Sequence, residues 1–310
     1  MKTRGWMVAT IVLAGLVAAP AAVPGVLAHH RGDFTLGAWL IGFGCAWATS
    51  NILLVSLWRL KPGPSWAMGV AALTLAGWAP LAVISTALPV RADLAMLTVT
   101  VAVALLHDRV SVSRWLVVGL LTILACVLDA TALVLPLGLT WAACMRRERF
   151  VPALAVLAAG IVALGCALVS GRPAMTSYRM IGVGYNLHRD LIVLLPILLL
   201  GLGGYLRSGR SRNGGTIPWW LPGWAAVGLV AVLAIVSTAP LNPRLAVLAM
   251  WWYVPTGLAD LARMVRRSPP QPPLLRAVGG LVLLVLILLS WSPIHQWVDS
   301  VYLAMYSLGI

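Results

Sequence analysis

The sequence predicts an all-α fold: a polytopic transmembrane helical bundle of about 11 spans with no sizeable soluble domain. Of the 310 residues, 61% are hydrophobic and only 10% are charged, more apolar surface than a water-soluble exterior tolerates. Apolar runs of about 18 residues or more recur along the chain, the length needed to cross the hydrocarbon core. The net charge of +14 lies in short basic clusters between these runs. That pattern orients membrane helices, and we expect no nucleic-acid partner.

We expect one membrane helix in each of eight apolar runs. These are Trp6–Ala28, Leu36–Trp58, Trp66–Val90, Val151–Ser170, Leu191–Leu206, Pro218–Thr238, Leu245–Ala262 and Ala277–Trp291. The first run follows two basic residues and ends in Val26-Leu27-Ala28, which resembles a signal-peptidase site. Its 23 residues exceed the usual signal-peptide core of about 7–15, so a retained helix is favoured over a cleaved signal peptide.

Two further regions are less regular. Leu94–Leu106 is short, and Trp115–Met145 is long, with Asp129 at its middle. The long stretch is either one tilted helix or two short helices joined near Asp129. With two helices, 16 of the 22 basic residues fall in cytoplasmic loops, whereas with one helix the split becomes 10 inside and 12 outside. The positive-inside rule therefore favours two helices and a cytoplasmic N-terminus, although helices of about 14 residues barely cross the hydrocarbon core.

The chain divides into a transmembrane core, residues 1–265, and a C-terminal part, residues 266–310. The C-terminal part comprises a Pro-rich cytoplasmic linker, the last transmembrane helix and a short outer interfacial tail. Aromatic clusters such as Trp219-Trp220 and Trp251-Trp252-Tyr253 fit an interfacial belt. The four cysteines lie in apolar runs without metal-like spacing, which predicts small packing residues rather than a zinc site or a disulfide: Cys45, Cys126, Cys144 and Cys166.

Unusual charges fall at the outer ends of the predicted spans. Six basic residues lie there against the positive-inside bias: Arg31, Arg91, Arg172, Arg179, Arg189 and Arg244. The same ends carry Asp33, Asp93, Asp129, Asp190, His29, His30 and His188. Guanidinium groups form paired hydrogen bonds to phosphate, and a nearby carboxylate can accept the proton of an incoming hydroxyl. This combination suggests group transfer from a lipid-linked phosphate donor.

Simpler interpretations of the same residues stay open. Asp33 fits a solvated loop acid or the cap of a helix that begins near Thr35. His29 and His30 fit interfacial loop residues better than metal ligands, because adjacent histidines point apart and a single carboxylate is nearby. Other roles that need no substrate are a local ion pair for Arg91 and Asp93, hairpin stabilisation for Asp129 and an interfacial anchor for Arg244.

Residues Trp66 to Arg147 resemble the GT-C superfamily of membrane glycosyltransferases. The resemblance lies in "PLAVISTALPVRADLAMLTVTVAVALL", the basic turn "HDRVSVSRW" and "LVVGLLTILACVLDATALVLPLGL", with Pro80, Arg91, Asp93 and Trp115 at the matching positions. The superfamily carries its catalytic acid in the first outer loop. The predicted first outer loop of this chain contains one acidic residue, Asp33. The superfamily also begins a late helix with an outer arginine, which points to Arg244 in "PRLAVLAMWWYVP".

The resemblance covers roughly residues 1 to 265, with three departures. The first loop holds one acid rather than two, Leu245 replaces an expected tyrosine, and no large outer domain follows the helices.

The resemblance implies a multi-pass enzyme of the plasma membrane with its active site on the extracytoplasmic face. It would transfer a sugar from a polyprenyl-phosphate-linked donor to a lipid, glycan or protein acceptor. Asp33 would be the general base, and Arg244, Arg91, Arg179 and Arg189 would bind the donor phosphate, supported by Asp93, Asp129 and His30. No cofactor is expected, and metal dependence stays open because no ligand cluster is evident.

Three alternatives belong to other classes: a non-catalytic scaffold, a lipid or sugar flippase, and an acyltransferase using His29 or His30. A flippase would need polar side chains lining a path through the helices.

Overall fold

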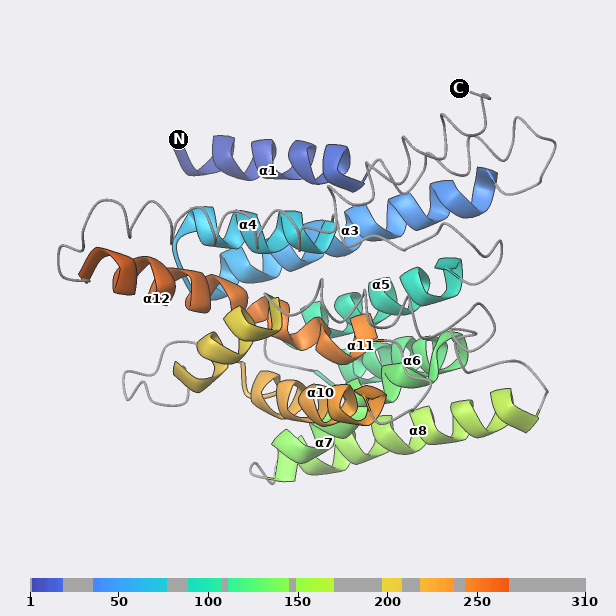
Figure 1. The fold of residues 1–310 in the computed structure, drawn as a ribbon. Coiled ribbons are helices and arrows are strands. Elements are labelled where there is room, and N and C mark those ends of the chain that lie inside the picture. The colour runs from blue at the N-terminus through green and yellow to red at the C-terminus, as the bar shows by residue number, and fades with distance from the viewer. Residues whose placement is uncertain are drawn as a thin grey trace.

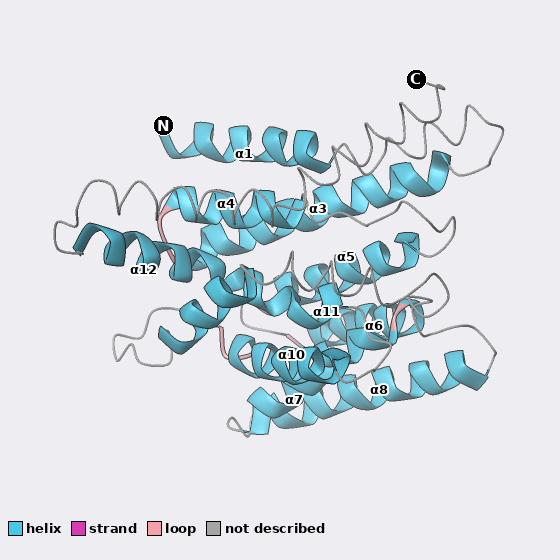
Figure 2. Cartoon of the chain, in the orientation of Figure 1, coloured by secondary structure: helices cyan, strands magenta, loops and turns pink. Residues whose placement is uncertain are grey.

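The computed structural model describes residues 2–18, 36–76, 89–107, 111–144, 149–169, 197–207, 218–236 and 243–267. These residues form helices and contain no strand, as Figures 1 and 2 show. The all-α prediction is therefore confirmed for the described part of the chain. The Pro-rich linker, the last predicted span and the outer tail lie outside the described residues.

Three helices begin and end within three residues of a predicted apolar run, namely those over Leu36–Leu60, Phe150–Val169 and Leu221–Val236. The α-helices are α1 (Lys2–Ala18), α3 (Leu36–Leu60), α4 (Ser65–Ala76), α5 (Pro89–Leu105), α6 (Val112–Leu128), α7 (Val134–Cys144), α8 (Phe150–Val169), α10 (Leu221–Val236), α11 (Pro243–Val247) and α12 (Val254–Arg267). An unlabelled helix covers Ile197–Arg207, and two 3₁₀ segments are η2 (Ala130–Leu133) and η5 (Leu248–Trp252). By length and apolarity alone, α8 in the described part is suited to cross a membrane by itself. The bent pair Leu245–Trp252 and Val254–Met264 would add a second span if counted as one.

Short connections pair successive helices. Helices α3 and α4, α5 and α6, and α7 and α8 each pack against each other. Lys61 ends α3 in the left-handed region, with φ of 48°, and its N–H donates to the Leu57 carbonyl at 2.8 Å. Ser111 caps the start of α6, where its hydroxyl accepts from the Arg114 N–H at 3.4 Å.

Helix α6 runs in the same direction as α8. Gly119 in α6 lies against Val156 in α8, and Cys126, further along α6, lies against Gly160, further along α8. Both contacts advance together along the two sequences, so the two helices are parallel neighbours.

Helix α7 runs in the opposite direction. Leu133 lies against Gly160, whereas Thr140, later in the chain, lies beside the earlier Ala153 and donates to its carbonyl at 3.3 Å. The chain therefore reverses between α6 and α7, at Asp129, and the two-helix interpretation of Trp115–Met145 is confirmed.

The run Leu245–Ala262 is not the single helix that its hydropathy predicts. It divides into α11, η5 and α12, with a bend of 53° between Leu245–Trp252 and Val254–Met264. The physical reason is Pro255, which has no N–H and fits only the first turn of a new helix. The prediction of one continuous helix was wrong here.

Four tryptophans of the C-terminal half pack inside the bundle rather than on its surface. Trp220, Trp224, Trp251 and Trp252 are among the largest fully buried side chains, and Tyr253 beside them is also buried. The Trp224 and Trp252 ring centroids lie 5.4 Å apart, and those of Trp220 and Trp252 lie 6.2 Å apart, edge to face. The expected interfacial belt was wrong for these residues, because the rings pack on one another where α10 and η5 meet.

Candidate functional site

The described basic side chains gather at one end of the bundle. The Arg149 guanidinium at the start of α8 lies 4.8 Å from the Trp219 ring centroid. Trp219 also faces Trp115 near the start of α6, with centroids 6.3 Å apart. His107, after α5, faces Trp220 at 5.3 Å. These contacts bring together the starts of α6, α8 and α10 and the end of α5.

Two further contacts extend this end of the molecule. The Thr256 hydroxyl of α12 donates to the Pro62 carbonyl at 3.0 Å, which joins α12 to the α3–α4 turn. Arg207 pairs with Asp260 of α12 at 3.8 Å. We call this region the basic end, defined by Arg59, Lys61, Arg114, Arg149, Arg207 and Arg263.

The opposite end contains the Asp129 reversal and the starts of α5 and α11. Segments α5, η2 and α11 all contact one another. Because α5 and α6 form a hairpin, the start of α5 lies toward the end of α6, where Asp129 follows. A Cβ on Gly228 of α10 would lie 2.2 Å from the carbonyl oxygen of Ala246, in α11, and 3.9 Å from Val134, which follows the Asp129 turn. Helix α10 is therefore a neighbour of both α11 and the Asp129 turn. We call this region the turn end.

The helices that carry Arg91, Asp93 and Arg244 thus contact one another and the Asp129 turn. Arg91 lies in the first turn of α5, Asp93 is the fifth residue of the same helix, and Arg244 is the second residue of α11. Their side chains lie outside the described part. The remaining predicted site residues, Asp33, His30, Arg179 and Arg189, also lie outside the described residues.

Asp129 is described in full and has a clear structural role. Its side chain is 1% exposed, and Oδ1 accepts the Thr131 N–H at 2.9 Å. Its own N–H donates to the Ala125 carbonyl at 2.8 Å, and its carbonyl accepts from the Ala132 N–H at 3.0 Å. Asp129 therefore ends α6 and caps η2, as the hairpin interpretation predicts.

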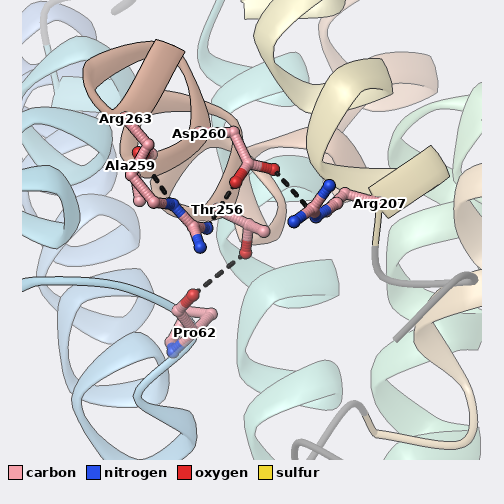
Figure 3. A network of polar contacts seen from close by, with 6 residues as sticks. All are labelled: Pro62, Arg207, Thr256, Ala259, Asp260 and Arg263. Carbon is pink, nitrogen blue, oxygen red and sulfur yellow. Dashed lines mark hydrogen bonds and ion pairs between the residues drawn. The ribbon is translucent and has the colours of Figure 1, made fainter. Parts of the chain in front are cut away.

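Sequence reasoning missed a charged network at the basic end. Figure 3 shows Asp260 between Arg207, from the helix Ile197–Arg207, and Arg263 of α12. Asp260 and Arg263 are three residues apart on an amphipathic helix, and this spacing was the available signal.

Polar side chains inside the described helices are largely satisfied locally. The Thr100 hydroxyl donates to the Met96 carbonyl at 2.7 Å, and Thr122 donates to Val118 at 2.8 Å. Ser50 joins α3 to α4 through the Ala72 carbonyl at 2.8 Å. These three hydroxyls bind backbone carbonyls, whereas Thr49 Oγ1 and Asn51 Oδ1 of α3 are buried without a hydrogen-bond partner among the described residues.

The structure gives no metal site within its described residues. No group of three or more His, Cys, Asp or Glu side chains is arranged there to hold an ion. None of the four cysteines forms a disulfide. Cys45 and Cys126 are buried as packing residues, whereas Cys144 and Cys166 lie on exposed faces of α7 and α8.

Comparisons of the chain with protein-family models, with curated proteins and with solved structures found no match. Function is therefore argued from the sequence and from the two ends of the bundle.

Proposed function

We propose that the chain is a polytopic membrane protein with about 11 spans in the plasma membrane. The support lies in apolar side chains on the outer faces of the helices. On α6, Val112, Leu116, Leu120 and Leu124 recur every four residues and are 48–78% exposed. On α8, Val169 is 90% exposed. Water-soluble proteins rarely expose such continuous apolar stripes, whereas lipid solvates them well.

The orientation follows from the charge distribution. The basic end faces the cytoplasm, since lysine and arginine are enriched on that side of membrane proteins. The turn end then faces the outside. Helix α6, with 17 residues, is about 26 Å long and is suited to a slightly thinned bilayer.

The proposed activity is transfer of a sugar from a polyprenyl-phosphate donor to an acceptor on the extracytoplasmic face. One observation carries it: the helices bearing Arg91, Asp93 and Arg244 contact one another and the Asp129 turn, away from the basic end. Arginine is uncommon at the outer surface of a membrane protein, and binding of a phosphate would account for its presence there. The donor class comes from the sequence resemblance to GT-C enzymes.

In this mechanism, Asp33 accepts the proton of the acceptor hydroxyl. The acceptor oxygen forms a bond to the anomeric carbon of the sugar, and the bond from that carbon to the phosphate oxygen breaks. Arg244 and Arg91 stabilise the negative charge on the departing polyprenyl phosphate. Arg179 and Arg189 add phosphate contacts, Asp93 and His30 support the site, and Asp129 holds the turn.

The hydroxyls that bind backbone inside the helices disfavour the flippase alternative. The transfer assay below distinguishes the scaffold alternative from an enzyme.

The test uses the full chain reconstituted in liposomes with a panel of polyprenyl-phosphate sugars. We expect transfer by the natural sequence and a loss of about a hundredfold or more in Asp33→Asn, because a general base contributes about 10²–10⁴-fold. Arg244→Ala should weaken use of the donor, seen as a higher KM. Arg114→Gln, at the basic end, is the matched control and should retain activity.

Full activity of Asp33→Asn would remove the base assignment. Absence of transfer with every donor in the panel would favour the scaffold, and movement of donor across the bilayer without transfer would favour the flippase.

A further inference from the structure

A single carboxylate at the basic end holds two guanidinium groups. Asp260 is 14% exposed at its side chain; Oδ1 accepts from Arg263 Nη2, and Oδ2 lies 3.8 Å from Arg207 Nε. In Figure 3 the two arginines approach Asp260 from opposite sides and from different helices. Among the described residues, one carboxylate therefore faces two guanidinium groups, which leaves a net positive charge of one on these three side chains.

Both guanidinium groups retain donors that no described residue uses. Each offers five N–H bonds in a fixed plane. Among the described residues, Arg263 donates from Nε to the Ala259 carbonyl at 3.4 Å and from Nη2 to Asp260, whereas Arg207 forms the ion pair of its Nε with Asp260 Oδ2 at 3.8 Å. The two side chains are 54% and 60% exposed. An exposed ion pair adds little to stability, so two oriented and accessible guanidiniums are better explained by an anionic ligand.

Neighbouring residues add positive charge to the same surface. The bond from Thr256 to the Pro62 carbonyl fixes α12 beside the α3–α4 turn. Arg59 in the last turn of α3 and Lys61 in the α3–α4 turn are both exposed. We call the set Arg59, Lys61, Arg207 and Arg263 the basic patch.

Exposed tryptophans show where this patch lies relative to a bilayer. Trp66, at the start of α4, is 40% exposed, and Trp6 of α1, which lies near Gly69 of α4, is 55% exposed. Met264, next to Arg263, is 66% exposed. Indole rings accumulate at the boundary between hydrocarbon and headgroups, so a basic patch at the same end is at headgroup depth.

We infer that Arg207 and Arg263 bind the phosphate of an anionic phospholipid headgroup, and that Asp260 positions both guanidinium groups. Lys61 and Arg59 extend the positive field that attracts the lipid. This inference rests on the membrane location in the proposed function, not on sugar transfer.

The test measures lipid binding by native mass spectrometry of the full chain released from detergent micelles. The micelles contain equal amounts of phosphatidylglycerol and phosphatidylcholine. We expect selective retention of phosphatidylglycerol. Each of Arg207→Gln and Arg263→Gln should lower its affinity by about fivefold, and the double variant by about twentyfold. Arg114→Gln, a basic-end residue outside the patch, is the matched control and should bind as the natural sequence does. Helicity by circular dichroism confirms that each variant is folded.

A double lysine variant distinguishes a specific phosphate site from general electrostatic attraction. The double change Arg207→Lys with Arg263→Lys keeps both charges but loses the planar fork, so we expect it to lose most of the selectivity. Full retention by the lysine variant, or by the glutamine variant, would overturn the inference. So would displacement of the lipid by millimolar inorganic phosphate, which would identify a soluble anion as the ligand. Sugar transfer is not part of the readout, so failure of the transferase proposal leaves this result interpretable.

Discussion

Asp129 supports the reversal between α6 and α7 through an oxygen acceptor. Its Oδ1 accepts the Thr131 N–H at 2.9 Å from a side chain that is 1% exposed. Asparagine keeps an Oδ1 acceptor, whereas alanine removes it from a buried position. We expect Asp129→Ala to lower the free energy of unfolding by about 1–3 kcal/mol and Asp129→Asn by less, measured by denaturant unfolding in detergent.

The same two variants distinguish a structural role of Asp129 from a role in the reaction. If Asp129 acts by holding the turn, Asp129→Asn retains sugar transfer as well as stability. A stable asparagine variant without activity would instead assign the negative charge a part in the reaction.

At this scale, sequence reasoning succeeded where one residue interrupts a pattern and failed where packing decides. Asp129 was noticeable because a carboxylate in the middle of an apolar run has few structural uses. Trp251 and Trp252 carry no such signal, since the same aromatic pair suits an interface or a core. Asp260 was overlooked because its partner Arg207 lies far away in the sequence.

At the scale of helices, backbone approaches through glycine hold the bundle together. A Cβ on Gly204 would lie 2.2 Å from the Tyr253 carbonyl oxygen and 3.1 Å from the Gly257 nitrogen. Gly257 in turn lies against the Leu200 carbonyl. Such close crossings suit membrane helices, which associate through small residues.

Adjacent glycines in the helix Ile197–Arg207 provide a matched test. We expect Gly204→Ala to lower the free energy of unfolding by about 1–3 kcal/mol or more, because rigid backbone must move. A Cβ on Gly203 would meet nothing within 4 Å, so Gly203→Ala should be neutral or stabilising by up to about 1 kcal/mol. Unfolding in detergent, followed by circular dichroism, measures both. Equal effects of the two changes would contradict the close crossing.

Helix positions were largely predictable because hydropathy changes sharply at the basic turns. The expected run Val151–Ser170 matches α8 to within one residue at each end. The break before α12 was missed, because the run remains apolar through Tyr253 while Pro255 interrupts only the backbone bonding. The apolarity of a segment predicts that it is buried but not that it forms one helix. Proline has no backbone N–H to donate, and this missing donor determines where a helix ends.

At the scale of the whole molecule, the two ends of the bundle should face opposite sides of the membrane. Contacts between α6, α7 and α8 make α6 and α8 parallel, so the start of α6 and the end of α8 lie at opposite ends. A single span over 115–145 would instead put both on the same side. The distribution of arginine and lysine predicts that the start of α6 is cytoplasmic.

Two introduced cysteines test this arrangement in a variant without the four natural ones. Ser113 is exposed at the start of α6, and Val169 is 90% exposed at the end of α8. We expect a membrane-impermeant maleimide to label Val169→Cys in intact spheroplasts and Ser113→Cys only after permeabilisation. Labelling of both in intact cells, or of neither, would contradict the reversal at Asp129 as a membrane topology. The opposite pattern would keep the reversal but invert the orientation, and would place the Arg91, Asp129 and Arg244 segments in the cytoplasm. The outer-face transferase proposal requires the first pattern, because polyprenyl-linked sugars must reach the turn end from the outside.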